Sequence, residues 1–189
     1  MSSGDGMSGA VQISWGPIPT SNICFPIGTP IQTDQGIVPI QFLCPVKNTI
    51  AGQPIQHITT TTTVDPYLIC FEPHALAYNS PNKTTVMTKD HKVLFQEQLV
   101  PAYRFLDFSD KVKKVKYEGE ILYNVLLATH STIVVNNMVC ETLHPENLIA
   151  KLYNSNMGIE YKNTMVTIMN ESLKNKDAET YKSIVYHMS

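Results

Sequence analysis

The feature that most constrains this fold is a series of short runs rich in β-branched and apolar residues, each ended by turn-forming residues. The series fills most of the chain between Cys24 and Thr142. Such runs favour β-strands, and the Gly, Pro and Asn residues between them favour turns. The predicted strands are residues 29–33, 37–43, 55–64, 67–72, 84–88, 91–95, 98–101, 113–117, 121–128, 132–135 and 138–142. We therefore predict an all-β body.

Two local patterns inside this body are informative. The pair Asn136-Asn137 stands between apolar runs, and asparagine tolerates the positive φ of a tight hairpin turn, so the flanking strands are expected to pair. The five consecutive threonines at 59–63 fit a β-branched strand with one solvated face. Only residues 101–106, with proline first, suggest a turn of helix within the body.

After Pro145 the residue pattern changes from one typical of strands to one typical of helices. Residues 146–153 suggest a short helix, and apolar residues at helical spacing suggest further helix over 162–188, interrupted at 174–176 and restarted with Asp177 as its cap. At the other end, residues 1–10 are small and polar and are expected to be disordered, and residues 11–15 alternate as a short strand would. We predict an N-terminal arm at 1–23, a β domain at 24–145 and a helical extension at 146–189.

Composition narrows the class of protein. A chain of 189 residues can bury the core of one domain. The net charge of −2 offers no basic surface for nucleic acid, and no apolar run is long enough to span a membrane. The four cysteines lack CxxC spacing, which argues against a zinc site, and no cofactor is predicted. Reduced cysteines in a reducing intracellular compartment are the favoured expectation.

The strongest candidate for chemistry is Cys24, which is followed by a Pro/Gly turn and an alternating strand. A cysteine can cut the peptide bond before it by attacking the preceding carbonyl, here that of Ile23, to give a thioester. This chemistry needs a proton donor for the departing nitrogen and donors that hold the peptide. The alternative is that Cys24 is an ordinary small residue of the core.

Histidine is the usual proton donor near neutral pH, and the chain has six. His91 is the first candidate, because Thr88-Lys89-Asp90-His91 places a hydroxyl and an imidazole at one turn between predicted strands. His130 is the second, since it follows the strong apolar strand at 122–128. His57 and His74 are expected to be strand or loop residues.

In their order along the chain, these segments resemble the Hint fold, which is shared by inteins and by the C-terminal autoprocessing region of Hedgehog proteins. The run from Cys24 to Ile40, with Gly28, Thr33 and Gly36, is similar to the first splicing block. Thr88-Lys89-Asp90-His91 matches the T-x-x-H of the second, and residues 122–137 resemble the late block. The resemblance implies a compact, horseshoe-like fold of short curved strands.

The same resemblance implies roles for the candidate residues. Cys24 would be the nucleophile, Thr88 and His91 would engage its amide, with His91 protonating the leaving nitrogen, and His130 would assist. The scissile bond would join Ile23 to Cys24, and the substrate would be the chain's own upstream polypeptide. The thioester would then be resolved by water, an added thiol or another nucleophile.

The chain also departs from the family pattern. Inteins end in His-Asn, but residues 139–145 contain no such pair, so one cut is favoured over full splicing. Asn124 stands where many inteins have an acidic residue. In Hedgehog proteins the resolving nucleophile is a sterol, which the composition of residues 146–189 does not support. Two alternatives stay open: a Hint-like binding or structural domain without catalysis, and, less favoured, a splicing-competent intein.

Overall fold

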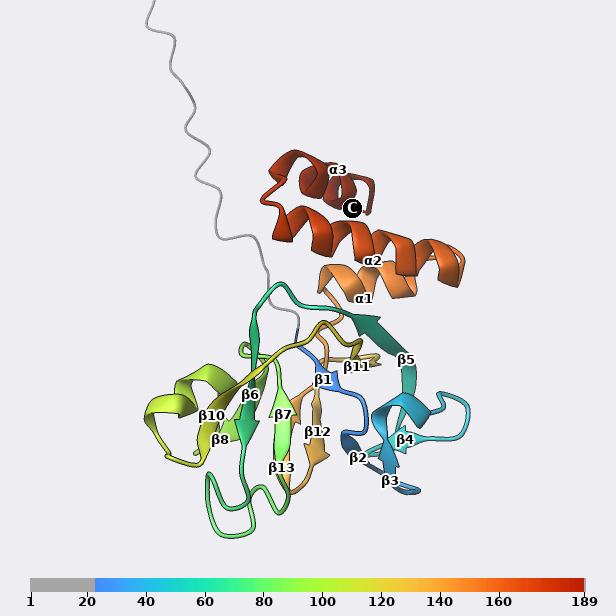
Figure 1. The fold of residues 1–189 in the computed structure, drawn as a ribbon. Helices are drawn as coiled ribbons and strands as arrows, with labels where there is room; N and C mark the ends of the chain where they lie inside the picture. The colour runs from blue at the N-terminus through green and yellow to red at the C-terminus, as the bar shows by residue number, and fades with distance from the viewer. Residues whose placement is uncertain (1–22, 189) are drawn as a thin grey trace, which may run out of the picture.

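A computed structural model describes residues 23–188; the predictions for residues 1–10 and 11–15 lie outside the described residues. The described part consists of a body of short strands with three helices stacked on one end (Figure 1). Helix α1 lies next to the strands, with α2 and α3 beyond it (Figure 1). The predicted all-β body with a helical C-terminal tail is therefore confirmed.

Within residues 23–188, thirteen strands form small antiparallel sheets, interrupted by two 3-10 turns. The strands are β1 (Phe25–Pro26), β2 (Pro30–Thr33), β3 (Gly36–Pro39), β4 (Thr49–Ile50), β5 (Gln53–Thr61), β6 (Tyr67–Phe71), β7 (Thr85–Met87), β8 (Lys92–Phe95), β9 (Gln98–Pro101), β10 (Val112–Lys116), β11 (Leu122–Leu127), β12 (Thr132–Val135) and β13 (Met138–Glu141). The 3-10 turns are η1 (Ile40–Phe42) and η2 (Ala102–Asp107). The helices are α1 (Leu148–Asn154), α2 (Ile159–Lys174) and α3 (Ala178–Met188).

The sheets are curled and antiparallel, as the resemblance to the Hint fold implied. One runs in the order β1-β11-β5-β4, a second β10-β6-β7, and a third β12-β13-β8-β9, while β2 and β3 form a separate hairpin. Strand β11 is central to the first sheet, since it pairs with β1 on one side and with β5 on the other. The residues that follow Ile23 are therefore held directly against β11.

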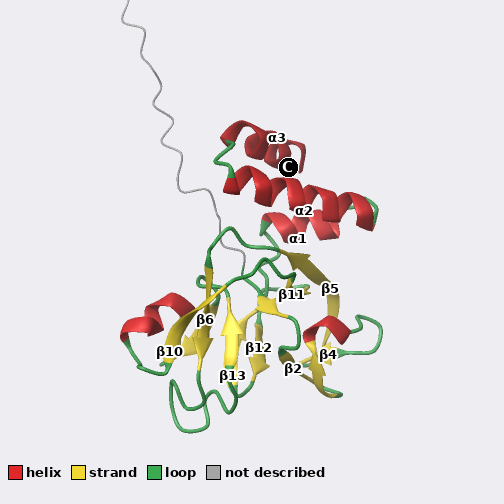
Figure 2. Cartoon of the chain, viewed as in Figure 1, coloured by secondary structure: helices red, strands yellow, loops and turns green. Residues whose placement is uncertain are grey.

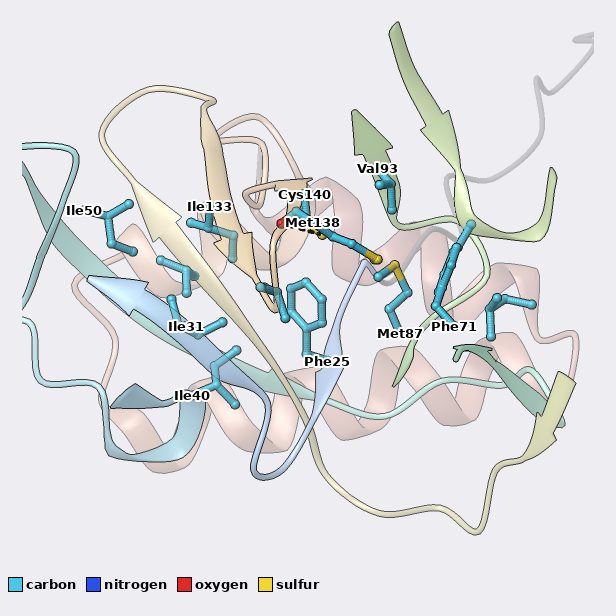
Figure 3. Close-up of a cluster of buried hydrophobic side chains, with 14 of the residues drawn as sticks. Phe25, Ile31, Ile40, Ile50, Phe71, Met87, Val93, Ile133, Met138 and Cys140 are labelled. Carbon is cyan, nitrogen blue, oxygen red and sulfur yellow. Dashed lines mark hydrogen bonds between the residues drawn. The ribbon is translucent and has the colours of Figure 1, made fainter. Parts of the chain in front are cut away.

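The core of the body lies between these sheets. Buried residues from β1, β2, β7, β8, β12 and β13 meet there, and Figure 3 shows the Phe25 ring among them, with Met87, Met138 and Cys140 nearby. Phe25, Ile31 and Met87 are completely buried. Because Phe25 is anchored in this core, the backbone of its neighbour Cys24 is fixed in position.

The predicted hairpin at Asn136-Asn137 is confirmed. Val135 pairs with Met138, and both asparagines have positive φ, 48° and 64°. The strand predicted over residues 37–43 is wrong in its second half. Strand β3 ends at Pro39, and the chain continues into the 3-10 turn η1. Proline cannot donate a ladder hydrogen bond, which accounts for the early end. The two-residue strands β1 and β4 were too short for any period to appear.

The threonine run behaves differently from the expectation of a solvated face. Strand β5 ends at Thr61, and the helices cover its polar side. The Tyr153 hydroxyl accepts a hydrogen bond from the Thr60 backbone amide at 3.0 Å, and the Asn170 amide donates to Thr61 Oγ1 at 2.9 Å. These threonines therefore dock the helices, which Figure 2 shows in red above the yellow strands.

Helices form where the apolar spacing predicted them. Asn147 caps α1 by accepting from the Ile149 amide at 2.9 Å, and Asp177 accepts from the Thr180 amide at 3.1 Å at the start of α3. Within residues 23–188, no helix has the length and apolar character needed to cross a lipid bilayer.

Candidate functional site

The Ile23–Cys24 peptide lies where three parts of the body meet. Cys24 immediately precedes β1, whose Phe25 lies opposite Tyr123 of β11, and the turn after β7 approaches from the other side. Both Ile23 and Cys24 are buried, with 7% and 3% of their surfaces exposed. The peptide bond between them is therefore withdrawn from solvent.

Thr88 holds the backbone of Cys24 on the amide side of this peptide. The Cys24 amide donates to Thr88 Oγ1 at 2.9 Å, and the Thr88 amide donates to the Cys24 carbonyl at 3.0 Å. The Thr88 hydroxyl also donates to that carbonyl at 3.4 Å. Because Thr88 is itself 2% exposed, its hydroxyl is a fixed partner of Cys24.

Asn124 holds the carbonyl side. Its side-chain amide, which is completely buried in β11, donates a hydrogen bond to the Ile23 carbonyl oxygen. The other end of the same amide accepts from the backbone N–H of Val125 at 2.7 Å. This second bond fixes which end of the side chain faces Ile23, so a donor is directed at the carbonyl carrying the bond of interest.

His91 is completely buried, and its ring lies against that of Phe25 with centroids 4.2 Å apart. Its Nε2 is 2.9 Å from the Glu141 carbonyl oxygen. A carbonyl only accepts, so in the neutral ring Nε2 carries the hydrogen and Nδ1 has the lone pair. Among the described residues, Nδ1 of His91 is the buried side-chain nitrogen or oxygen that has no hydrogen-bond partner.

The protonation of His91 follows from this environment. Burial lowers the pKa of His91, and the carbonyl and charge of Glu141 and the backbone of Cys24 offset this only in part. The ring is therefore neutral at neutral pH, with Nδ1 free to take a proton. The His91 ring packs against that of Phe25, the residue that follows Cys24.

The Cys24 thiol lies in apolar surroundings formed with Leu68 and Leu122. Burial raises the pKa of this thiol well above its ordinary value. It is therefore a thiol and not a thiolate at neutral pH, and it needs a base to become a nucleophile. All four cysteines of the chain are free in the structure.

His130 occupies a different position from the other candidates. Its Nε2 lies 3.2 Å from a carboxylate oxygen of Glu141, and its ring centroid is 4.8 Å from that of His144. The second Glu141 oxygen accepts from the Lys92 amide at 3.0 Å. His130 is thus connected to His91 through Glu141, and the structure gives it no hydrogen bond to Cys24.

The structure brings Cys24, Thr88 and His91 together, and it places in contact with them or with Ile23 two further residues whose positions sequence reasoning missed. Asn124 was noted only for lacking a carboxylate, whereas its amide is a donor to Ile23. The sequence offered one signal for Glu141, because it is an acidic residue in an otherwise apolar strand. In the structure its side chain is buried, with 5% of its surface exposed. His57 and His74 lie in β5 and in a loop, as expected.

The described residues offer no obvious place for a metal ion. Within residues 23–188, no group of three or more His, Cys, Asp or Glu side chains is arranged to hold one.

Comparison with known families identifies the domain to which these residues belong. Residues 23–147 match the family model described as Hint domain, so the match begins at Ile23 and includes every residue of the site. A search of curated proteins found no match.

Proposed function

Because the chain belongs to the Hint domain family, whose members are generally associated with self-processing, we propose that it cuts its own backbone between Ile23 and Cys24. One observation carries the proposal. The amide side of this peptide is held by Thr88 and the carbonyl side by Asn124, while His91, whose Nδ1 has no hydrogen-bond partner, packs its ring against Phe25, the residue that follows Cys24. A site, and not a fold alone, is what supports an activity.

The first step would be an N-to-S acyl shift. His91 Nδ1 accepts the thiol proton of Cys24, and the sulfur attacks the carbonyl carbon of Ile23 through a five-membered ring. The attacking group and the carbonyl belong to adjacent residues, so the reaction gains the advantage of proximity. The C–N bond then breaks, His91 returns the proton to the departing nitrogen, and a thioester joins Ile23 to Cys24.

Asn124 would stabilise the charge that develops during this step. As the sulfur attacks, the Ile23 carbonyl oxygen becomes an oxyanion, and the Asn124 amide already donates to it. Thr88, which accepts from the Cys24 amide, would orient that nitrogen toward its new proton. Both residues are buried, so their hydrogen bonds act without competition from water.

Glu141 would act through the two histidines and not on the substrate. Its carbonyl fixes the His91 tautomer, and its carboxylate pairs with His130, so His130 would assist from a distance. In the second step a nucleophile such as water or a thiol attacks the thioester, the sulfur leaves, and the upstream segment is released with Ile23 at its end.

Incubation of the full chain with dithiothreitol tests this proposal. The expected result is two fragments by intact mass, separated between Ile23 and Cys24, and none from Cys24→Ala. Cys44→Ala is the matched control, because Cys44 lies outside the site, and it should be cut as the wild type is. If the chain remains uncleaved after days of incubation with dithiothreitol, the result would favour a Hint domain that has a binding or structural role and no catalytic activity.

A further inference from the structure

The side chain of Ile23 is packed as tightly as a core residue. It is 7% exposed and belongs to a buried apolar cluster separate from the main core of the body. The other members of this cluster include Leu126, Leu143, Ile149, Ala150, Leu152 and Val166. The residue that would precede the cut is therefore enclosed by residues from elsewhere in the chain.

One wall of this enclosure is strand β11. Side chains two apart on a strand point to the same face, so Leu126 lies on the face from which Asn124 reaches the Ile23 carbonyl. The Val125 carbonyl accepts from the Leu143 amide at 3.0 Å, which fixes Leu143 against the same strand. The apolar wall and the carbonyl donor thus belong to one rigid element.

The other wall is the helical extension. Ile149, Ala150 and Leu152 come from α1, and Val166 comes from α2. Tyr153 fixes α1 in place, because its hydroxyl bonds to Thr60 at 3.0 Å and its carbonyl accepts from Lys162 Nζ at 2.6 Å. The helices lie on the end of the body where β5 and β11 run (Figure 1).

The contrast with the downstream side is clear. Ile27, three residues after Cys24, is 60% exposed, whereas Ile23 is buried. Of these two isoleucines, the protein encloses the one on the acyl side of the peptide. That side chain would also remain attached to Cys24 in the thioester.

We propose that β11 and the helical extension form an apolar subsite that selects a large aliphatic residue immediately before the scissile bond. This inference rests on the proposed function and deepens it. The preferred substrate is an upstream segment whose last residue is aliphatic. The helices α1 and α2 then act as a specificity element, because seating this side chain aligns the carbonyl with the Asn124 amide.

Substitution of Ile23 in the full chain tests the subsite, with cleavage by dithiothreitol followed by intact mass. Ile23→Val should be cut at close to the wild-type rate. Ile23→Ala should be slower by up to about 50-fold, as expected for lost burial of its methyl and methylene groups. Ile23→Asp should be slower by at least about 100-fold, because an unpaired carboxylate is strongly disfavoured in an apolar site. Ile27→Asp is the control and should be cut normally.

A reciprocal pair separates selection from a general loss of structure. Ile23→Phe overfills the subsite and Leu126→Ala enlarges it, so each alone should slow cleavage. The variant that carries both substitutions should be cut at least about 10-fold faster than Ile23→Phe alone, because the larger phenylalanine ring fits the enlarged subsite. Circular dichroism confirms that each variant is folded at the assay temperature.

The outcomes are distinguishable. If the wild type is cut, Cys24→Ala is not, and Ile23→Asp is cut as fast as the wild type, the subsite is wrong and the proposed function stands. Independent, multiplicative effects in the double variant would also overturn the subsite. A folded wild type that is never cut overturns the proposed function and the subsite with it.

Discussion

At the scale of single residues, the site holds two ionisable groups in their neutral forms. Burial raises the pKa of the Cys24 thiol and lowers that of the His91 imidazole. In the proposed first step, a proton passed from the thiol to His91 and on to the Cys24 nitrogen leaves no net charge behind. A buried site without bulk water favours this kind of relay, since an isolated charge there is costly.

The residue most open to a direct test is Asn124. Asn124→Ala removes the donor to the Ile23 carbonyl and should slow thiol-induced cleavage by about 10²–10³, the cost of losing one oxyanion donor. Single-turnover rates by intact mass measure this effect.

Asn170→Ala is a matched control for Asn124. Asn170 is also buried and also bonded through its side-chain amide, but its partners are Thr61 and Thr62 on the docking surface of the helices. This variant should be less stable and yet be cut at nearly the normal rate while folded. Equal rates for both variants would remove Asn124 from the proposed mechanism.

His91 makes a second residue-scale prediction, on stability. Its pKa is lowered in the folded chain, so the unfolded state binds a proton first as the pH falls. Stability is then present above the unfolded pKa of about 6.5 and declines below it, toward the lowered native pKa. Denaturant unfolding of Cys24→Ala, which is not cut, should show this decline.

The comparison is with a chain that also carries His91→Gln. Glutamine does not titrate, so the double variant should lack this part of the pH dependence, and the two stability curves should approach each other as the pH falls. A constant difference between the curves from pH 7.5 to pH 5 would show that the His91 pKa is not lowered.

At the scale of elements, turn chemistry explains much of what the sequence predicted. The Asn136-Asn137 hairpin was recognised because asparagine tolerates positive φ. The corresponding turn between β8 and β9 uses Gln96 and Glu97, which have φ of 49° and 65° but carry no turn signal. There the pairing of two apolar strands overrides local preference, so this pair of residues is strained.

Glu97→Gly should relieve that strain. Glycine adopts positive φ without penalty, and the gain should exceed its entropic cost by about 0.5–1 kcal/mol. Denaturant midpoints at unchanged slope, measured in the Cys24→Ala background, check this value. Gln98→Gly, one residue later in strand β9, should instead lower stability. A loss of stability in both variants would contradict the strain.

The helical extension marks the limit of prediction at this scale. Its helices follow from apolar spacing, but their docking on the threonine run does not, because Thr60 meets Tyr153 across 93 positions of the chain and Thr61 meets Asn170 across 109. From the sequence alone, a polar strand face is predicted to be solvated, because the segment that covers it cannot be identified. The separate domain boundaries at residues 23 and 145 stay a prediction.

At the scale of the whole molecule, the site exists because the topology joins distant segments. Cys24 meets Thr88 across 64 positions, Asn124 meets Ile23 across 101, and His91 meets Glu141 across 50. The order of motifs was enough to predict Cys24, Thr88 and His91 as partners. It was not enough for Asn124 or Glu141, since their roles depend on which face of β11 and which end of β13 approach the peptide.

The burial of Ile23 has a consequence for the molecule after the proposed cut. One aliphatic side chain contributes about 1.5–3 kcal/mol on burial, which corresponds to binding weaker than millimolar, so the upstream segment should not be retained by Ile23 alone. Its departure would leave a gap between β11 and the helices.

Thiol-treated wild type should therefore melt about 3–12 °C below uncut Cys24→Ala. Thermal unfolding by circular dichroism, after the small fragment is removed by size exclusion, measures the difference, with thiol-treated Cys24→Ala as the control. Identical melting temperatures for the cut and uncut chains would show that Ile23 does not stabilise the contact between body and helices.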